Sequence, residues 1–308
     1  LDISFLNSNS IKLKDYIGEF DNINTEKILL DFDLLKNRVR LELGSTKLKK
    51  YNNNFSNINA RNISATIKIS DLIKKNIIIE SLNISDGNID IQNITIDTGN
   101  KNLADLFKGI PVKYINLKNI NLNLYKEESR IAVANNINGI IQKKPKHLIL
   151  DSLSVGYLEY LDSSNKNKVI INKLLVSNKY TDNYIISLDS LNLINKKNLI
   201  NIKYFKRIKN ISLKSIIANY NIDNKKLSLE GDVLVKDEIS KIYLNGFYND
   251  SIITNTLVKI KLKKFKLLSF IEDDILNASN YSLQNAIKLN FNGDINLNID
   301  NNKLSYID

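Results

Sequence analysis

The stretch SDLIKKNIIIESLNISDGNIDI, residues 70–91, begins with a few helix-like residues and ends as a run in which apolar and polar residues alternate. Two other stretches follow the same plan: DFDLLKNRVRLEL at 31–43 and NLADLFKGIPVKYINLKNINLNL at 102–124. Successive side chains of a β-strand point to opposite faces, so such alternation indicates a strand with one apolar and one polar face. A unit that leads from a helical turn into such a strand therefore occurs three times.

Alternation continues through most of the chain, with clear examples at Ile120–Leu124, Leu227–Val235, Val258–Lys263 and Ile295–Ile299. A parallel strand covered on both faces would instead read as a continuous apolar run. The abundant Ile, together with Tyr and Phe, supplies the strand propensity. We therefore predict a mainly β fold: an elongated, repeat-built, largely antiparallel curved sheet that forms a groove and carries a few short helices.

The helical segments that the sequence predicts are few and mostly short. They are Asp33–Lys36, Ser70–Lys75, Leu103–Lys108 and the longer Phe265–Asn277. The length of 308 residues would allow two ordinary domains or one elongated region. We predict one elongated β-repeat region over residues 1–308, a fragment of a longer chain, with a soft division near 142–147.

Composition narrows the classes of protein further. With 43% hydrophobic and 25% charged residues the chain can bury a sizeable core. Cysteine is absent, which excludes disulfides, zinc–cysteine sites and thiol chemistry. The chain starts at Leu1, lacks methionine and has no apolar run of about 18 residues, so we expect an excised piece without its signal or anchor. The net charge of +11 accompanies an excess of Asn, Ile and Lys that is typical of an AT-rich genome, and we discount it accordingly.

Two repeat patterns can be followed along the chain. The turn Asp-Leu-apolar-Lys begins at Asp33, Asp71 and Asp105, at spacings of 38 and 34 residues. The pattern apolar-x-x-(apolar or Gly)-x-apolar recurs at spacings of 33, 38, 33 and 25, from Ile84, Leu117, Val155, Leu188 and Leu213. Units of this size cannot close a core alone, so neighbouring units must pack edge to edge. Chance matching remains an alternative for the second pattern, whereas leucine-rich repeats need a period of 20–29 residues and are excluded.

The repeated unit resembles a known family. The segments LLKNRVRLELGSTKLKKY, LIKKNIIIESLNISDGNIDI and LFKGIPVKYINLKNINLNLY are similar to the helix-to-strand units of the AsmA-like family of Gram-negative bacteria, of the YhdP and TamB type. The segments KKLSLEGDVLVKDEISKIYLNGFYND and IKLNFNGDINLNIDNNKLSYI are similar to the later strands of that family. The chain departs from the family by its low glycine content and its missing membrane anchor.

This resemblance implies a protein of the periplasm that is anchored in the inner membrane in its full-length form. Its β units would curl into a long groove, apolar inside and wet outside. The resemblance also implies phospholipid transport between the inner and outer membranes and outer-membrane biogenesis, with phospholipid acyl chains and the inner membrane as partners. It carries over no catalytic residues.

The apolar positions of the clearest strands are the candidates for lining the groove. A long one-sided sheet needs cover from a second sheet, helices or a ligand, and acyl chains would gain about 0.8 kcal/mol per buried CH₂. The alternative is a β-sandwich or solenoid whose apolar faces cover each other. The candidate residues are Ile89, Ile91, Ile120, Leu122, Leu124, Leu158, Tyr160, Leu227, Leu229, Val258, Ile260, Leu262, Ile295, Leu297 and Ile299.

The sequence offers little material for catalysis or metal binding. His147 is the only histidine and has no nucleophile placed beside it, so we interpret it as a surface residue. Asp273 and Asp274 would point about 100° apart on a helix and are not a poised pair. Asp86–Asn88 lacks the spaced ligands of a calcium loop and indicates a turn or a G1-type bulge. We predict no enzyme, no catalytic residue, no metal and no cofactor.

Basic runs raise the alternative of nucleic-acid binding. Aromatic residues are scarce around them and no nucleic-acid motif is present, so no nucleic-acid partner is expected. We interpret the runs as solvated strand faces that could also attract anionic lipid headgroups. They are Lys47/Lys49/Lys50, Lys143/Lys144/Lys146 and Lys259/Lys261/Lys263/Lys264/Lys266.

The function that we expect is therefore non-enzymatic. A passive apolar β-groove would shield acyl chains from water while the headgroups stay at its open edge. The alternative is a β-solenoid adhesin or structural surface protein, which should show rungs of about 20–30 residues and a protein-filled interior.

Overall fold

The structure is a computed structural model, and almost everything in its described part is β-strand. The described residues are 22–50, 56–74, 78–91, 112–126, 129–143, 148–161, 167–178, 183–195, 210–235, 238–249, 252–266, 290–300 and 303–307. The chain divides into two compact units, Leu1–Ser154 and Val155–Asp308, here called unit 1 and unit 2. The predicted soft division near 142–147 lies a few residues before this boundary, and residues 144–147 are outside the described part.

Unit 1 holds eight strands, the first half of β9 and one described helix. Its elements are β1 (Asn22–Thr25), β2 (Ile28–Asp33), β3 (Arg38–Leu43), β4 (Thr46–Lys50), β5 (Ser56–Lys68), α3 (Ile69–Ile73), β6 (Ile79–Ile91), β7 (Val112–Lys126), β8 (Ser129–Lys143) and β9 (Leu148–Leu161). Strand β5 pairs antiparallel with β3, β4 and β6, and β2 and β1 continue the sheet from β3 and β4. Strand β7 is parallel to β6 and antiparallel to β8.

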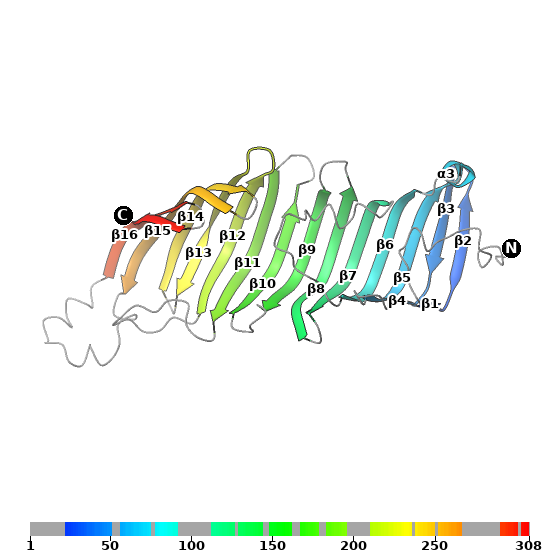
Figure 1. The fold of residues 1–308 in the computed structure, drawn as a ribbon, viewed down its shortest axis with the longest axis horizontal. Coiled ribbons are helices and arrows are strands. Elements are labelled where there is room, and N and C mark those ends of the chain that lie inside the picture. Colours follow the sequence, from blue (N-terminus) through cyan, green and yellow to red (C-terminus); the bar gives the residue numbers. More distant parts are fainter. Residues whose placement is uncertain are drawn as a thin grey trace, which may run out of the picture. The chain divides into compact units, whose positions relative to one another are not determined.

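Unit 2 continues from the second half of β9 as a succession of antiparallel neighbours. Strand β9 pairs with β10, and from β10 to β17 each strand pairs antiparallel with the next one (Figure 1). The prediction of a mainly β, largely antiparallel fold is confirmed. The strands are β10 (Asn167–Ser177), β11 (Asn183–Asn195), β12 (Asn210–Asn221), β13 (Lys226–Val235), β14 (Glu238–Asn249), β15 (Ile252–Lys266), β16 (Asn290–Asp300) and β17 (Lys303–Ile307).

The predicted helices fare unequally. The helix predicted at Ser70–Lys75 is confirmed over Ser70–Ile73, as part of the short helix α3 (Ile69–Ile73) that leads from β5 toward β6, while Lys75 lies outside the described part. Asp33–Lys36 was wrong as a helix, because it forms a tight turn between β2 and β3. There the carboxylate of Asp33 accepts a hydrogen bond from the backbone N–H of Lys36. Asn37, with a φ of 54°, is the last residue of the turn.

The remaining helix predictions touch residues outside the described part. Leu103–Lys108 lies entirely outside it, as does most of Phe265–Asn277. The prediction of a helix that begins at Phe265 is wrong. Phe265 and Lys266 instead end strand β15, opposite Phe291 and Asn290 of β16. Alternating polar and apolar residues thus extend β15 further than helical spacing indicated.

The spacing of 33 residues in the second repeat has a structural basis in unit 1. Strands β6 and β7 pair in parallel with Ile84 opposite Leu117, and Ile89 opposite Leu122. Each pair is 33 residues apart, so equivalent positions of the repeat stand side by side. Asn side chains follow the same register, as Asn121 donates to Asn88 and Asn119 donates to Asp86.

The pattern apolar-x-x-apolar-x-apolar is the sequence of a β-bulge. A bulge inserts one residue into a strand, so the apolar side chains flanking it are three rather than two positions apart. In β6 this residue is Asp86, whose φ is 53°, and the register with β5 and β7 is the same on both sides of it, because the neighbouring strands carry an extra residue at the same level. Asp86–Asn88 is therefore a bulge within a strand and not a turn between strands. Equivalent positive-φ residues occur inside six other described strands: Asn119, Asn136, Ser152, Lys173, Ser215 and Asn255.

The bulges also locate the core of the sheet. The residue after the inserted one is buried in five strands: Gly87, Ile120, Ile137, Ile216 and Thr256. At such a position the bent strand brings backbone and side chains of its neighbours close together. Ile120 is 1% exposed and Thr256 is 2% exposed. Several of the most deeply buried residues therefore lie where the strands bend, while Thr46 at the start of β4 is buried independently of a bulge.

Candidate functional site: the apolar face of the sheet

In unit 1 the apolar side chains of neighbouring strands stand opposite one another in continuous rows. The bulges keep them aligned, because each shifts its strand by one residue at the same level. The rows, from strand to strand, are Leu30–Leu41–Ala65–Leu82–Ile115–Ile141, Ile28–Leu43–Ile63–Ile84–Leu117–Gly139 and Ile58–Ile89–Leu122–Ala134. One face of the unit 1 sheet is thus apolar across its described width.

Unit 2 carries a similar row across seven strands, from β10 to β16. Ile186 of β11 lies between Val176 and Ala218, and Leu244 of β14 lies between Leu229 and Val258. Most side chains on this row are half-buried, whereas Ala218 and Val258 are buried. The full row is Val176–Ile186–Ala218–Leu229–Leu244–Val258–Leu297.

The structure brings many of the candidate lining residues together. In unit 1, Ile89 is opposite Leu122 and Ile91 is opposite Leu124. In unit 2, Val258 is opposite Leu297 and Ile260 is opposite Ile295, while Leu227 and Leu262 face Gly246 and Gly293. Ile299 is opposite the buried Thr256. These candidates are therefore brought together within each unit by the pairing of successive strands.

Exposure separates these candidates into two groups. Ile120 at 1% and Val258 at 7% are core residues whose side chains are covered by neighbouring strands. Most others, including Ile89, Leu122 and Leu124, are half-buried and leave part of the side chain accessible. In β9, Leu158 is half-buried and Tyr160 is 37% exposed. The half-buried group is the part of the face that can contact a ligand.

The opposite face of unit 1 is lined with asparagine and aspartate side chains that bond from strand to strand. Asp90 of β6 accepts hydrogen bonds from Asn57 of β5 at 3.4 Å and from Asn123 of β7 at 2.8 Å. Seven residues earlier on β6, Asn83 donates to Ser64 at 3.0 Å and accepts from Asn116. These ladders satisfy the polar side chains within the sheet and stabilise its register.

Asparagine also satisfies the backbone at the bulges. A bulged residue loses its ladder partner, so its N–H needs another acceptor. The N–H of Asn119 donates to the side chain of Asn138 at 2.8 Å, and the N–H of Asn136 donates to the side chain of Asn121 at 3.0 Å. In unit 2 the N–H of Asn255 donates to Asp300 at 3.3 Å. The side chains on the polar face thus fix the bend that shapes the apolar face.

Strand β8 departs from simple two-sided alternation. Val133 stands opposite Asn123 and therefore lies on the polar face, yet it is 8% exposed. Ile131, two residues away on the same face, is also buried. The polar face of unit 1 therefore contains a local apolar cluster on β8 that alternation alone did not predict.

Ion pairs neutralise several basic residues of unit 2. Lys241 pairs with Asp232 at 2.7 Å, and this hydrogen bond raises the pKa of Lys241 above its usual value. Lys259 pairs with Asp294, and the ammonium of Lys261 lies 5.4 Å from the ring centroid of Tyr243. Three lysines of the β14–β15 region thus have partners inside the sheet.

Other candidate chemistry lies outside the described part or is not assembled within it. His147, Asp273 and Asp274 belong to residues that the structure does not describe. Among the described residues, no three histidine, aspartate or glutamate side chains gather as a possible metal site. No helix in that part of the chain is long and apolar enough to cross a membrane.

Sequence reasoning missed two features of this site. The first is the row of bulges, whose signal was present as the apolar-x-x-apolar spacing. The second is a set of exposed aliphatic residues at one end of unit 1, which includes the Leu-Leu pair of the β2–β3 turn.

Compared with known proteins, the chain matches no family model, no curated protein and no solved structure.

Proposed function

We propose that this chain is a non-enzymatic protein of the bacterial cell envelope whose apolar sheet face binds phospholipid acyl chains. In this proposal it acts in the periplasm, tethered at the inner membrane, in phospholipid transport between the membranes and in outer-membrane biogenesis. The resemblance of the three repeated sequence segments to the AsmA-like family supports this assignment. The lipid type and the direction of transport belong to the full system and not to this surface.

The observation that carries the proposal is the continuity of the apolar rows. They run from strand to strand in each unit, and most of their side chains are half-buried rather than buried. Apolar area that remains in contact with water is a source of binding free energy, at about 25 cal/mol per Å² removed from water. An acyl chain lying across the strands would follow one row from strand to strand and would gain about 0.8 kcal/mol per buried CH₂.

The polar face supports the same orientation. Its Asn and Asp ladders are satisfied within the sheet and present a hydrated surface. Lipid would therefore bind on one face only, with water on the other. A passive surface of this kind needs no catalytic residue.

Strand pairing distinguishes this function from the adhesin alternative. A β-solenoid builds its rungs from parallel strands of successive repeats. Among the described strand pairs whose register is given residue by residue, β6 and β7 are parallel and the others are antiparallel. Antiparallel neighbours joined by turns favour an open sheet whose face needs an external cover.

The experiment is mass spectrometry of lipids that remain with the purified chain. Leu122 and Leu124 are suitable positions because both are half-buried on the apolar face, whereas Ile120 at 1% exposure would test folding instead. We expect the double variant Leu122→Asp/Leu124→Asp to retain several-fold less phospholipid than the unaltered chain, since two carboxylates would have to be desolvated by the acyl chains.

The matched control is Ile140→Asp in β8. Ile140 is 39% exposed and stands opposite Asn116, on the polar face of the same unit. Its replacement should leave the retained lipid unchanged. Equal lipid occupancy in all folded variants, or no phospholipid in any sample, would contradict the proposal.

A further inference from the structure

Three large aliphatic side chains protrude at one end of unit 1. Leu34 and Leu35 belong to the β2–β3 turn, and Ile73 belongs to α3, which Figure 1 shows beside that turn. Leu34 is 76% exposed, Ile73 is 77% exposed and Leu35 is fully exposed. A fully exposed leucine contacts no other part of the molecule. We call these three residues the aliphatic tip.

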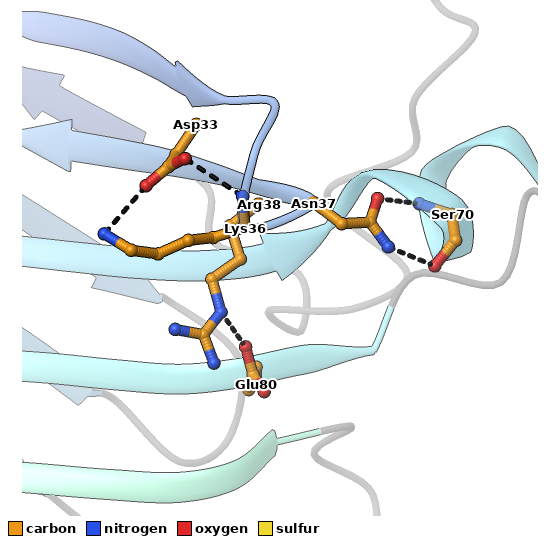
Figure 2. A network of polar contacts seen from close by, with 6 residues as sticks. All are labelled: Asp33, Lys36, Asn37, Arg38, Ser70 and Glu80. Carbon is orange, nitrogen blue, oxygen red and sulfur yellow. Dashed lines mark hydrogen bonds and ion pairs between the residues drawn. The ribbon is translucent and has the colours of Figure 1, made fainter.

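Hydrogen bonds hold the turn and the helix together as one body (Figure 2). The side chain of Asn37 accepts the backbone N–H of Ser70 and donates to its hydroxyl, both at 3.2 Å. The backbone carbonyl of Asn37 also accepts the N–H of Ile69 at 3.1 Å. The aliphatic tip is therefore presented on a fixed support and not on an isolated loop.

Polar contacts stiffen both sides of this support. Asp33 caps the turn through the backbone N–H and the ammonium of Lys36, and these bonds hold the pKa of Asp33 below its usual value. Arg38 pairs with Glu80 of β6 at 2.8 Å. The strand that follows the turn is thus linked to the strand that follows α3.

The charge around the aliphatic tip is positive. Segments 33–38 and 68–74 carry four basic and two acidic side chains, and a third acidic residue, Glu80, pairs with Arg38. The net charge is therefore +1, and Lys74 and Lys36, the latter paired with Asp33, are exposed next to the aliphatic residues. Lysine side chains of this kind can keep their ammonium groups in the headgroup layer while adjacent aliphatic groups enter the acyl region. The chain as a whole is also basic, with a net charge of +11.

We propose that the aliphatic tip inserts into the surface of an anionic lipid bilayer. Three protruding side chains offer on the order of a few hundred Å² of apolar surface, less than the roughly 500–800 Å² that each partner buries in a stable protein interface. A bilayer surface needs no complementary shape and accepts shallow insertion of aliphatic groups flanked by lysine. The tip would place one end of unit 1 against a membrane.

This contact is separate from the proposed lipid-binding face. The aliphatic tip consists of turn and helix residues, whereas the lipid-binding face consists of rows on β2 to β8 and β10 to β16. The two can therefore succeed or fail independently. Retained lipid would be lost in the Leu122→Asp/Leu124→Asp variant without any change at the aliphatic tip.

A single-tryptophan experiment tests the insertion, because the chain has no tryptophan of its own. Leu35→Trp places the reporter on the aliphatic tip, and Ile140→Trp places a matched reporter on the polar face of β8. Each variant is mixed with vesicles of phosphatidylcholine and phosphatidylglycerol, and with vesicles of phosphatidylcholine alone. Lipids brominated in the acyl chain serve as quenchers.

The expected result is a shift of Leu35→Trp emission to shorter wavelength, with quenching by brominated lipid, on the anionic vesicles and less on the neutral ones. Ile140→Trp should show neither effect. Flotation of the otherwise unaltered chain with anionic vesicles should fall by roughly tenfold or more in Leu34→Ser/Leu35→Ser, since two leucine side chains lose their transfer free energy. Both leucines are exposed, so these variants should fold.

Three results would overturn the proposal. One is Leu35→Trp emission that anionic vesicles do not change. Another is an equal response of Leu35→Trp and Ile140→Trp. The third is a shift that grows with protein concentration in the absence of vesicles, which would assign the aliphatic tip to a protein contact.

Discussion

At the scale of single residues, glycine is placed where neighbouring strands leave no room for a side chain. A Cβ on Gly246 of β14 would lie 1.9 Å from the hydroxyl oxygen and 2.6 Å from the Cα of Thr256 in β15. Thr256 is 2% exposed and its hydroxyl donates to the carbonyl of Thr254, so it cannot move aside easily. We expect Gly246→Ala to lower the free energy of unfolding by about 1–3 kcal/mol or more.

Gly293 of β16 provides the matched control for urea unfolding. A Cβ there would meet nothing within 4 Å, and the strand lies in the same unit. Gly293→Ala should leave stability unchanged or raise it by about 0.4–1 kcal/mol, because alanine restricts the unfolded chain. Equal stability of the two variants would show that β14 and β15 do not approach so closely.

Asparagine gains a structural meaning at the same scale. The composition alone was explained by an AT-rich genome, yet Asn119 and Asn136 adopt φ values of 52° and 56° that most residues avoid. Asn121 and Asn138 then accept the backbone N–H groups of these bulged residues. Coding bias and structural use are compatible, since an abundant residue can be retained where its conformation and amide group are needed.

At the scale of the strand, the bulge is the element that unites the repeat. Asn119 combines a positive φ with a hydrogen bond from its side chain to Asp86 at 2.9 Å. Asn119→Val should destabilise unit 1 by about 1–3 kcal/mol, because a β-branched residue is strained at positive φ. Asn119→Gly relieves the strain and should remain within about 1 kcal/mol of the unaltered chain. Urea unfolding measures all three proteins.

Lys118→Val is the control for this substitution. Lys118 precedes the bulge, is exposed and lies at an ordinary extended position opposite Ser85. Valine suits an exposed strand position, so stability should change little. A loss as large as that of Asn119→Val would mean that side-chain polarity, and not the bulge conformation, explains the effect.

Much of the β structure could be predicted from alternation. The runs Ile120–Leu124, Leu227–Val235 and Ile295–Ile299 all lie in strands, and the short helix α3 (Ile69–Ile73) overlaps the helix predicted from Ser70 onward. The longer helical prediction failed where it overlaps β15, since a short apolar run can satisfy either period. Residues beyond Lys266 in that segment lie outside the described part.

The bulges were only half visible in the sequence. Three repeats contain a residue with positive φ two positions after their start. These repeats start at Ile84, Leu117 and Leu213, and the positive-φ residues are Asp86, Asn119 and Ser215. The repeat that starts at Val155 contains no such residue, because the positive-φ residue of β9 is Ser152. The repeat that starts at Leu188 lies in β11, where no described residue has positive φ. Lysine or serine at an inserted position leaves no distinctive signal, since the conformation is imposed by pairing with the neighbouring strands.

At the scale of the whole molecule, the residues of the apolar face within each unit can be predicted from the sequence. How deeply each of these side chains is buried cannot. Alternation placed Ile89, Leu122 and Leu124 together, and the register confirms that Ile89 is opposite Leu122 and Ile91 opposite Leu124. Ile120 was grouped with them, although the bend buries it. Burial along the bend depends on the pairing with the preceding and following strands, where Gly87 and Ile137 stand opposite Ile120, and alternation within one strand does not contain this information.

The most direct test of the account is photocrosslinking from the apolar face. A photoreactive phenylalanine analogue at Leu122, half-buried opposite Ile89, is compared with the same analogue at Ile140 on the polar face, after irradiation in the presence of phospholipid vesicles. The account predicts phospholipid adducts at position 122 that are several-fold more abundant than at position 140. Adducts that are absent at 122, or equally abundant at both positions, would contradict an acyl-chain-binding face.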